Sequence, residues 1–287
     1  VVIPSRRCLA TSAMVFPTSK ELSLIKSISS LERYSICTIL YFKQATIKKM
    51  NVLRLLMFFS ALLNGNIIVA QEANTFKPVT ATTLIILGTI QDAGSPQIGC
   101  TKDCCKNLFT HPDKGRMVVS LGLIDADNNK KYIFEATPDF TQQAKLLKIF
   151  SAFNTKESPD GIFTTHAHFG HYTGLMYLGK EAMNADSIPV YAMPRMKNFL
   201  EQNGPWSQLV KNKNIALQEL SNKKEIQLTN SLKVIPFTVP HRDEFSETIG
   251  YTIIGPNKKA LFIPDIDKWE KWDTNIIDAI AKVDYAF

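Results

Sequence analysis

Apolar runs of strand length recur from residue 83 onward and are separated by polar turns. The run Thr83–Gly88 predicts a buried strand that ends in a glycine turn, and alternating positions over 117–124 and 131–136 predict two paired strands. Further strands are predicted at 159–165, 189–192, 231–237, 250–254 and 260–263, and helices at 142–150, at 194–203 and directly after residue 171. Paired strands followed by strands that alternate with helices indicate an α/β (α+β) fold, with two packed sheets flanked by helices.

The front of the chain has the layout of a secretory signal peptide. A short basic region at 50–54 is followed by an apolar run, and the pattern closes at Val69-Ala70-Gln71, where a small residue precedes the cut. The apolar run is shorter than the ~20 residues of a membrane span, and Asn64-Gly65-Asn66 interrupts it. We therefore expect an exported protein, periplasmic or secreted, with a signal peptide at 50–70 and no stable membrane span after cleavage.

Residues 1–49 lie upstream of this signal and show no clear helical or strand period. We interpret them as leader sequence without a function, and a structured N-terminal extension is the alternative. The net charge of +7 belongs to residues 1–70, which hold nine Lys and Arg against two Glu. The charges of residues 71–287, the expected domain, balance, so the high pI does not indicate a nucleic-acid partner.

Three of the five histidines lie within six residues, on the predicted strand-to-helix loop: His166, His168 and His171. Two imidazoles spaced i, i+2 at a strand end can project to one side, and a third can fold back toward the same point. Neutral imidazole is a preferred ligand of zinc and iron. The cluster therefore predicts a metal site, and a chance group of surface or core histidines is the alternative.

This segment resembles the first metal motif of the metallo-β-lactamase superfamily, His-x-His-x-Asp-His, with Gly170 in place of the Asp. The resemblance implies an αββα sandwich with metals at the strand ends. It also implies two further ligands, His241 and Asp265, which each follow a predicted strand. The family Asp binds the second metal, so we expect that Gly170→Asp would add metal.

The chain stops at Val283–Phe287, and no His follows Asp265. Relatives in the family continue with a strand and a loop that brings a final metal-binding His. We therefore expect the C-terminal part of this domain to be truncated, with an apolar strand left at an unpaired edge.

A Gly-rich Pro-Gln segment at 94–99 precedes three cysteines: Cys100, Cys104 and Cys105. This segment and the stretch His171–Met176 resemble the coenzyme PQQ biosynthesis protein B group. The thiols could hold a structural zinc with a fourth ligand such as His111. In an exported protein, two of them could instead form a disulfide that includes Cys100.

The chemistry that we predict is metal-assisted hydrolysis of a small-molecule substrate, either an ester, a lactone, a phosphodiester or a β-lactam. The first metal site would comprise His166, His168 and His241, with Asp265 bridging or completing it. Asp265 and His171 would begin a second site and act in catalysis. We expect one or two Zn²⁺ ions, with Fe or Mn as alternatives. A non-haem-iron oxidase or oxygenase and an inactive metal-binding protein are the alternative functions.

Overall fold

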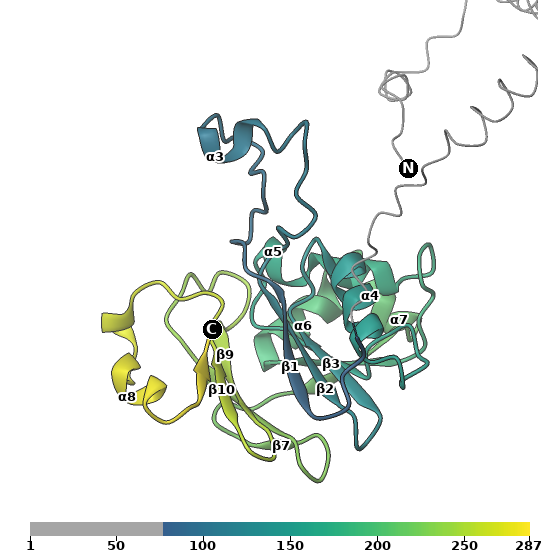
Figure 1. Ribbon diagram of the computed structural model, residues 1–287, viewed down its shortest axis with the longest axis vertical. Coiled ribbons are helices and arrows are strands. Elements are labelled where there is room, and N and C mark those ends of the chain that lie inside the picture. The colour runs from purple at the N-terminus through teal and green to yellow at the C-terminus, as the bar shows by residue number, and fades with distance from the viewer. Residues whose placement is uncertain (1–76) are drawn as a thin grey trace, which may run out of the picture. The chain divides into compact units, whose positions relative to one another are not determined.

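Two β-sheets form the centre of the structure, a computed structural model that describes residues 77–287 (Figure 1). These described residues fall within one compact unit. The leader expected at 1–49, the signal peptide at 50–70 and the domain start at residue 71 lie outside the described residues. Among residues 77–287, no helix has the length and apolar character that a membrane crossing requires.

The first sheet has six strands in the order β1-β2-β3-β4-β5-β6. Its strands are β1 (Thr83–Gly88), β2 (Ser120–Asp125), β3 (Lys130–Phe134), β4 (Gly161–Phe163), β5 (Ile188–Ala192) and β6 (Ile215–Glu219). The first three strands pair antiparallel, and from β3 onward the neighbours are parallel. The carboxyl ends of β3, β4 and β5 therefore meet at one edge of the sheet, which is where open α/β sheets carry their ligand sites.

The second sheet has five strands in the order β11-β10-β9-β8-β7. Its strands are β7 (Ile226–Gln227), β8 (Lys233–Thr238), β9 (Ile249–Ile254), β10 (Lys259–Phe262) and β11 (Tyr285–Ala286). Strand β11 is parallel to β10, and the other neighbours are antiparallel. The predicted apolar strand at 283–287 thus contains β11, which is hydrogen-bonded to β10.

The core between the sheets is aromatic. Successive residues of a strand point to opposite faces, so Ile162 of β4 packs under the helices whereas Phe163 packs between the sheets. The Phe163 ring stacks on Tyr191 and on Phe134, with centroids 4.3 and 4.7 Å away, and meets Tyr251 of the second sheet edge to face at 5.6 Å. Burial of these large rings joins the two sheets and fixes how their ends face each other.

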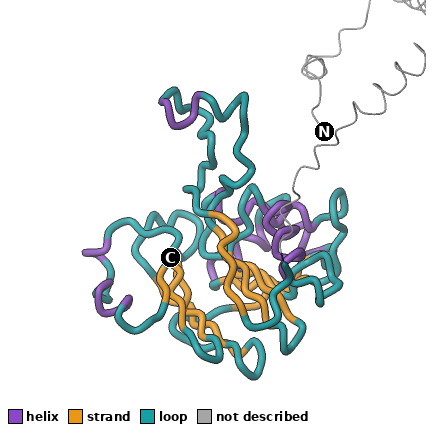
Figure 2. The backbone as a smooth tube through the Cα atoms, viewed as in Figure 1, coloured by secondary structure: helices purple, strands orange, loops and turns teal. Residues whose placement is uncertain are grey.

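Helices cover the outer face of each sheet (Figures 1 and 2). The first sheet is covered by α4 (Phe140–Phe150), the 3-10 helix η2 (Thr173–Leu178), α6 (Pro194–Gln202) and α7 (Trp206–Lys211). On the second sheet, α8 (Ile276–Ile280) and the segment that follows the 3-10 helix η3 (Trp269–Lys271) pack on buried strand residues. The expected αββα sandwich is confirmed.

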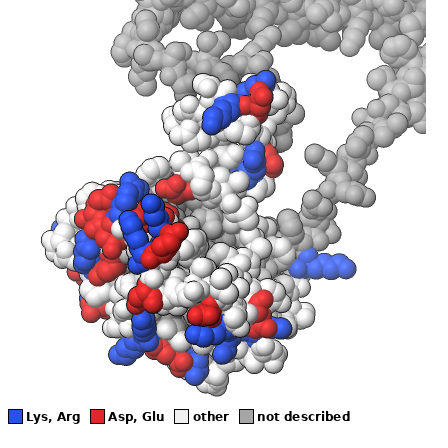
Figure 3. Space-filling view, turned by 90° about the vertical axis from the view of Figure 1, so that its left-hand side faces the viewer, with Lys and Arg blue, Asp and Glu red and all other residues white. Residues whose placement is uncertain are grey.

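Two differences from the predicted elements have local causes. The strand expected at 117–124 begins at Ser120, because Val118 instead forms a single bridge with Ile90. Helix α7 and strand β6 were not expected, because each is too short for a clear periodic pattern. Helix α7 packs into the core against the first sheet, and β6 joins that sheet beside β5. The described surface is mixed in charge on the side that carries α8, where basic and acidic side chains are interspersed (Figure 3).

Candidate metal centre

His166 and His168 lie on the loop that follows β4, as the pattern predicted, whereas the helix begins at Phe169 rather than after residue 171 and so includes His171. His166 and His168 precede the short helix α5 (Phe169–Tyr172), which contains His171. The Tyr251 hydroxyl of β9 donates to the carbonyl oxygen of Thr164 at 2.5 Å. Through this buried hydrogen bond the second sheet holds the start of the ligand loop.

The other two predicted ligands come from the second sheet. His241 follows β8 and Asp265 follows β10, and the two loops are joined because the Asp267 amide donates to the carbonyl oxygen of Pro240 at 2.8 Å. Strand ends of both sheets therefore supply the site, which none of the separate sequence segments could form alone.

Four side-chain atoms converge at the centre of the site, from His166, His168, His241 and Asp265, and lie within 4.8 Å of one another. His168 Nδ1 is 2.9 Å from His166 Nε2 and 3.1 Å from His241 Nε2. Asp265 Oδ2 is 3.2 Å from His241 Nε2 and 3.6 Å from His166 Nε2. Zinc–nitrogen bonds of about 2.0–2.1 Å in a tetrahedron separate two donor atoms by roughly 3.3 Å. The spacing therefore fits one metal ion held by these four residues.

The outer ring nitrogens indicate that the inner ones carry lone pairs. His166 Nδ1 lies 3.0 Å from the Thr165 hydroxyl, and His168 Nε2 lies 2.9 Å from a Glu244 carboxylate oxygen. A carboxylate only accepts, so His168 Nε2 carries a proton and the inner Nδ1 of His168 is an acceptor. The Thr165 hydroxyl can accept from His166 Nδ1 in the same way. Burial, followed by the neighbouring histidines, lowers the pKa of His166, which keeps this ring neutral. Lone pairs that face each other and a carboxylate repel unless a cation lies between them, so the donor set fits a divalent metal.

His171 is held by a buried carboxylate that the sequence reasoning missed. Its Nδ1 hydrogen-bonds Glu135, which follows β3 and is fully buried. Its Nε2 is buried without a hydrogen-bond partner among the described residues and lies 3.9 Å from Asp265 Oδ2. An acidic residue at the end of the buried run 131–136 is the signal that could have identified Glu135.

Burial and mutual charge change the pKa of both members of this pair. Burial raises the pKa of Glu135, because the carboxylate loses its hydration. Burial lowers the pKa of His171, but Glu135, together with the charges of Asp265 and Asp92, outweighs burial and raises it. The contact with Glu135 orients the ring, so that Nε2 faces Asp265.

Gly170 is packed against a residue from a distant part of the chain. A Cβ atom added to Gly170 would lie 2.4 Å from the Cβ and 2.5 Å from the carbonyl oxygen of Asp92. Asp92 follows β1 and did not figure in the predicted site. We therefore no longer expect Gly170→Asp simply to add a ligand, because a side chain at position 170 would have to displace Asp92.

The three cysteines lie together, away from the histidines. They are on and next to α3 (Asp103–Lys106), in the segment between β1 and β2 that stands away from the sheets in Figure 1. The Sγ atom of Cys104 is 3.7 Å from that of Cys100 and 3.9 Å from that of Cys105, and all three thiols are free. This group does not include His111. The structure therefore brings together the three thiols of the predicted zinc site, but it does not place His111 beside them as a fourth ligand.

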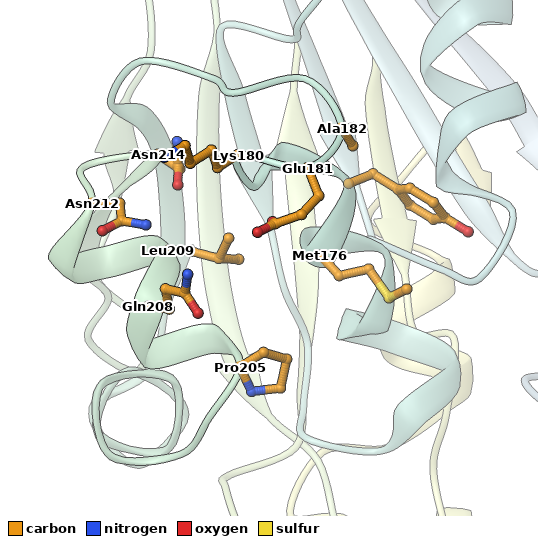
Figure 4. A pocket seen from close by; sticks show the side chains of 10 residues that line it. Met176, Lys180, Glu181, Ala182, Pro205, Gln208, Leu209, Asn212 and Asn214 are labelled. Carbon is orange, nitrogen blue, oxygen red and sulfur yellow. The ribbon is translucent and has the colours of Figure 1, made fainter.

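A pocket of about 300 Å³ lies between η2 and α7 (Figure 4). Its lining includes Met176, Glu181, Gln208 and Leu209, and none of the ligand histidines. This cavity is therefore not the metal centre, which is built by loops at the strand ends.

A family model described as "Beta-lactamase superfamily domain" matches residues 130–287. Since the match covers more than half of the chain, the chain belongs to this family, the metallo-β-lactamase superfamily that the histidine motif indicated. The match contains all five proposed ligands of the metal centre, from His166 to Asp265, and begins after β2.

Two solved structures are similar to this chain. Zinc-bound PqqB from Methylobacterium extorquens is 19% identical, with a TM-score of 0.52 over 64% of this chain and 65% of that chain. A diphosphatase of the PhnP family is 24% identical, with a TM-score of 0.45 over 63% of this chain and 64% of that one. The likeness to PqqB shows a common fold and agrees with the resemblance seen in the sequence. In both cases the chain spans just under two thirds of the other protein.

One curated relative is similar over a shorter stretch. An octanoyltransferase from Porphyromonas gingivalis (strain ATCC BAA-308 / W83) is 33% identical over 91 residues, which is 32% of this chain and 16% of that protein. Because the chain spans so little of that protein, the name of the relative does not describe the activity of this chain.

Proposed function

We propose that this protein is a metal-dependent hydrolase whose centre is formed by His166, His168, His241 and Asp265. The observation that supports the proposal is the convergence of three imidazole nitrogens and one carboxylate oxygen within 4.8 Å. A divalent cation bound there supplies a Lewis acid and lowers the pKa of bound water toward ~7.

The residues of the site have distinct roles in this proposal. The three histidines bind the cation. Hydrogen bonds at the outer nitrogens of His166 and His168, to Thr165 and Glu244, fix the orientations of these two rings. The Asp265 side chain is 30% exposed, whereas His166 is buried. Asp265 is therefore the ligand that solvent and substrate reach, and its carboxylate can orient a water molecule and accept its proton.

Metal content and turnover test this proposal together. We expect purified protein to bind zinc and to hydrolyse one class among chromogenic esters, lactones, phosphodiesters and β-lactams. His166→Ala and Asp265→Asn should remove most turnover, and His166→Ala most of the metal at this centre. His111→Ala is the matched control, because this exposed histidine lies outside the centre.

The alternative functions give different results in the same measurements. Iron in the purified protein together with oxygen uptake would replace hydrolysis with oxidase or oxygenase chemistry. Bound metal without turnover on any class would leave a metal-binding protein. An unchanged metal load in His166→Ala would contradict the ligand assignment itself.

We also propose that the protein is exported, on the basis of the signal-like pattern at 50–70. N-terminal sequencing of protein recovered from the periplasm or medium should give a mature start at or near Gln71. A mature start upstream of residue 50 would contradict cleavage at this signal.

A further inference from the structure

Asp92 occupies the space next to Gly170 in which the family's carboxylate would begin. The position of a Cβ on Gly170 is 2.4 Å from Asp92 Cβ and 2.8 Å from Asp92 Cα. These separations are far below van der Waals contact, so the two positions cannot both carry a side chain in this backbone. The side chain of Asp92 thus starts almost where that of an Asp at position 170 would start.

The turn that carries Asp92 is fixed by its own hydrogen bonds. The Gly94 amide donates to the carbonyl oxygen of Gln91 at 3.0 Å, and the Gln91 side-chain amide donates to the carbonyl oxygen of Gly94 at 2.9 Å. Gly94 has a φ of 80°, which favours glycine. Ile90, just before the turn, bridges to Val118. The backbone of Asp92 is therefore anchored on both sides.

The Asp92 carboxylate is free to bind a ligand. Within residues 77–287 it has no hydrogen bond and no ion pair, although the residue is half-buried. Its side chain begins beside Gly170, which directly precedes His171 in the chain. The packing therefore brings Asp92 next to the loop that carries the histidine of the second site.

His171 provides an independent sign of a ligand at this position. Its side chain is 1% exposed, and its Nε2 has no hydrogen-bond partner among the described residues. Glu135 holds the other ring nitrogen, so Nε2 faces Asp265 at 3.9 Å, which is beyond hydrogen-bond distance. A buried ring nitrogen requires a partner, and a cation between it and the carboxylate would supply one.

We propose that Asp92 replaces the carboxylate missing at position 170 and, with His171 and Asp265, binds a second divalent cation next to the first. The inference rests on the proposed metal centre and extends it to a dinuclear site with one ligand from a different loop. Asp265 belongs to both sets, since Oδ2 lies 3.2 Å from His241 Nε2 and 3.9 Å from His171 Nε2. A shared carboxylate is suited to bridge two cations.

Zinc binding by Asp92→Asn tests this proposal on the full chain. We expect wild type to bind one more zinc equivalent at the histidine centre than Asp92→Asn, or to bind it more than about 100-fold more tightly, because a ligand is lost rather than an outer contact. His171→Ala should lose the same equivalent. Asp127→Asn is the matched control, because Asp127 is an exposed acid in the β2–β3 turn.

The outcomes separate this inference from the proposed function. If His166→Ala loses zinc while Asp92→Asn binds as much zinc as wild type and as tightly, the second-site ligand is wrong and the first site stands. If His166→Ala keeps its zinc, the proposed centre fails as well. Circular dichroism and thermal melts of zinc-free protein check that each variant is folded.

Gly170→Ala provides a second test that removes no ligand. Its Cβ must displace Asp92, so zinc binding at the second site should weaken as in Asp92→Asn. If the effect passes through Asp92, Gly170→Ala should add nothing further in an Asp92→Asn background. Zinc binding as tight in Gly170→Ala as in wild type would contradict the inference, because displacement of Asp92 would then cost no ligand.

Discussion

Glu135 has a left-handed backbone conformation, and the contacts of this residue in the candidate site explain why it is kept. Its φ is 79°, in the left-handed region that side chains other than glycine rarely adopt, at a cost of about 1–3 kcal/mol. Its amide donates to the carbonyl oxygen of Phe163 at 2.8 Å, and one carboxylate oxygen accepts from the Thr165 amide at 3.1 Å. The strained residue thus connects the ends of β3 and β4 and presents its other oxygen to His171.

Glu135→Gln should weaken the second metal site while leaving the first intact. Glutamine can still accept a hydrogen bond from His171 Nδ1, but the negative charge that strengthens His171 as a ligand is lost. We expect zinc affinity at the second site to fall about 10–100-fold, as measured by competition with a chelator. Glu157→Gln, on an exposed residue paired with Lys145, is the control. Unchanged affinity at both sites would show that Glu135 has only a structural role.

Lys131 is a charged residue that is buried, which the alternating pattern of its strand did not predict. It lies on β3 but is 1% exposed, and its ammonium group donates to the carbonyl oxygen of Lys156. Burial, reinforced by Lys148, lowers the pKa of Lys131 from 10.5 to about 8. The hydrogen bond to a backbone carbonyl helps to keep the Lys131 ammonium charged at neutral pH, and burial of this charge lowers the free energy of unfolding.

The stability of the protein should depend on pH through Lys131. Between pH 8 and 10.5 the unfolded chain holds the proton more tightly than the folded one. The free energy of unfolding therefore gains a contribution that increases as the pH rises through this range. Urea unfolding of metal-free protein at several pH values would measure it. Lys131→Met should remove this contribution, and Lys114→Met, an exposed lysine, should retain it. Identical slopes in both variants would contradict the assignment.

At the scale of elements, the segment that carries α3 contains a separate candidate site. Cys100, Cys104 and Cys105 bring three Sγ atoms together within 4.8 Å. Cys104 and Cys105 lie on a helix of only four residues, and Cys100 lies just before it. Such a short helix cannot be stable by its own propensity, so the segment requires other contacts or a bound metal to keep its shape. Zinc with thiolate ligands is the metal that suits this donor set.

Cys105→Ser should remove one zinc equivalent that does not depend on the histidines. The loss should appear equally in wild type and in a His166→Ala background, because the two groups share no residue. Elemental analysis after dialysis would measure it. His111→Ala should leave the zinc content unchanged, since His111 is not part of the cysteine group. Equal zinc in Cys105→Ser and wild type would contradict a thiolate site.

At the scale of the molecule, the metal centre depends on the packing of one sheet on the other. His166, His168 and His171 follow a strand of the first sheet, whereas His241 and Asp265 follow strands of the second. The Tyr251 hydroxyl connects the two, because it reaches across the interface to the Thr164 carbonyl. The free energy of unfolding and the metal geometry are therefore coupled through the same interface.

Tyr251→Phe should destabilise the protein by about 1–3 kcal/mol, because the buried Thr164 carbonyl loses this donor while the ring packing is kept. Urea unfolding of metal-free protein isolates the effect from metal binding. Tyr285→Phe is the control, because Tyr285 is 52% exposed. A loss of stability as large in the control as in Tyr251→Phe would show that this hydrogen bond does not hold the sheets together.

The sequence by itself predicted many of the strands and helices and the three clustered histidines of the candidate site. Alternating and continuous apolar runs predicted β1, β3, β5 and α4 closely, because burial on a sheet face leaves a local pattern. The spacing of His166, His168 and His171 predicted a ligand loop, because residues that are neighbours in sequence at a strand end are also neighbours in space. His241 and Asp265 were assigned only through the resemblance to the family.

The tertiary structure alone decided which distant residues complete the site. Asp92 lies 78 positions before Gly170 in the chain and meets it only because β1 and α5 are brought to the same edge. Glu135 and His171 become partners through the pairing of β3 with β4. Neither contact leaves a periodic signal, because a contact between distant segments depends on how the sheets and loops pack and not on local spacing.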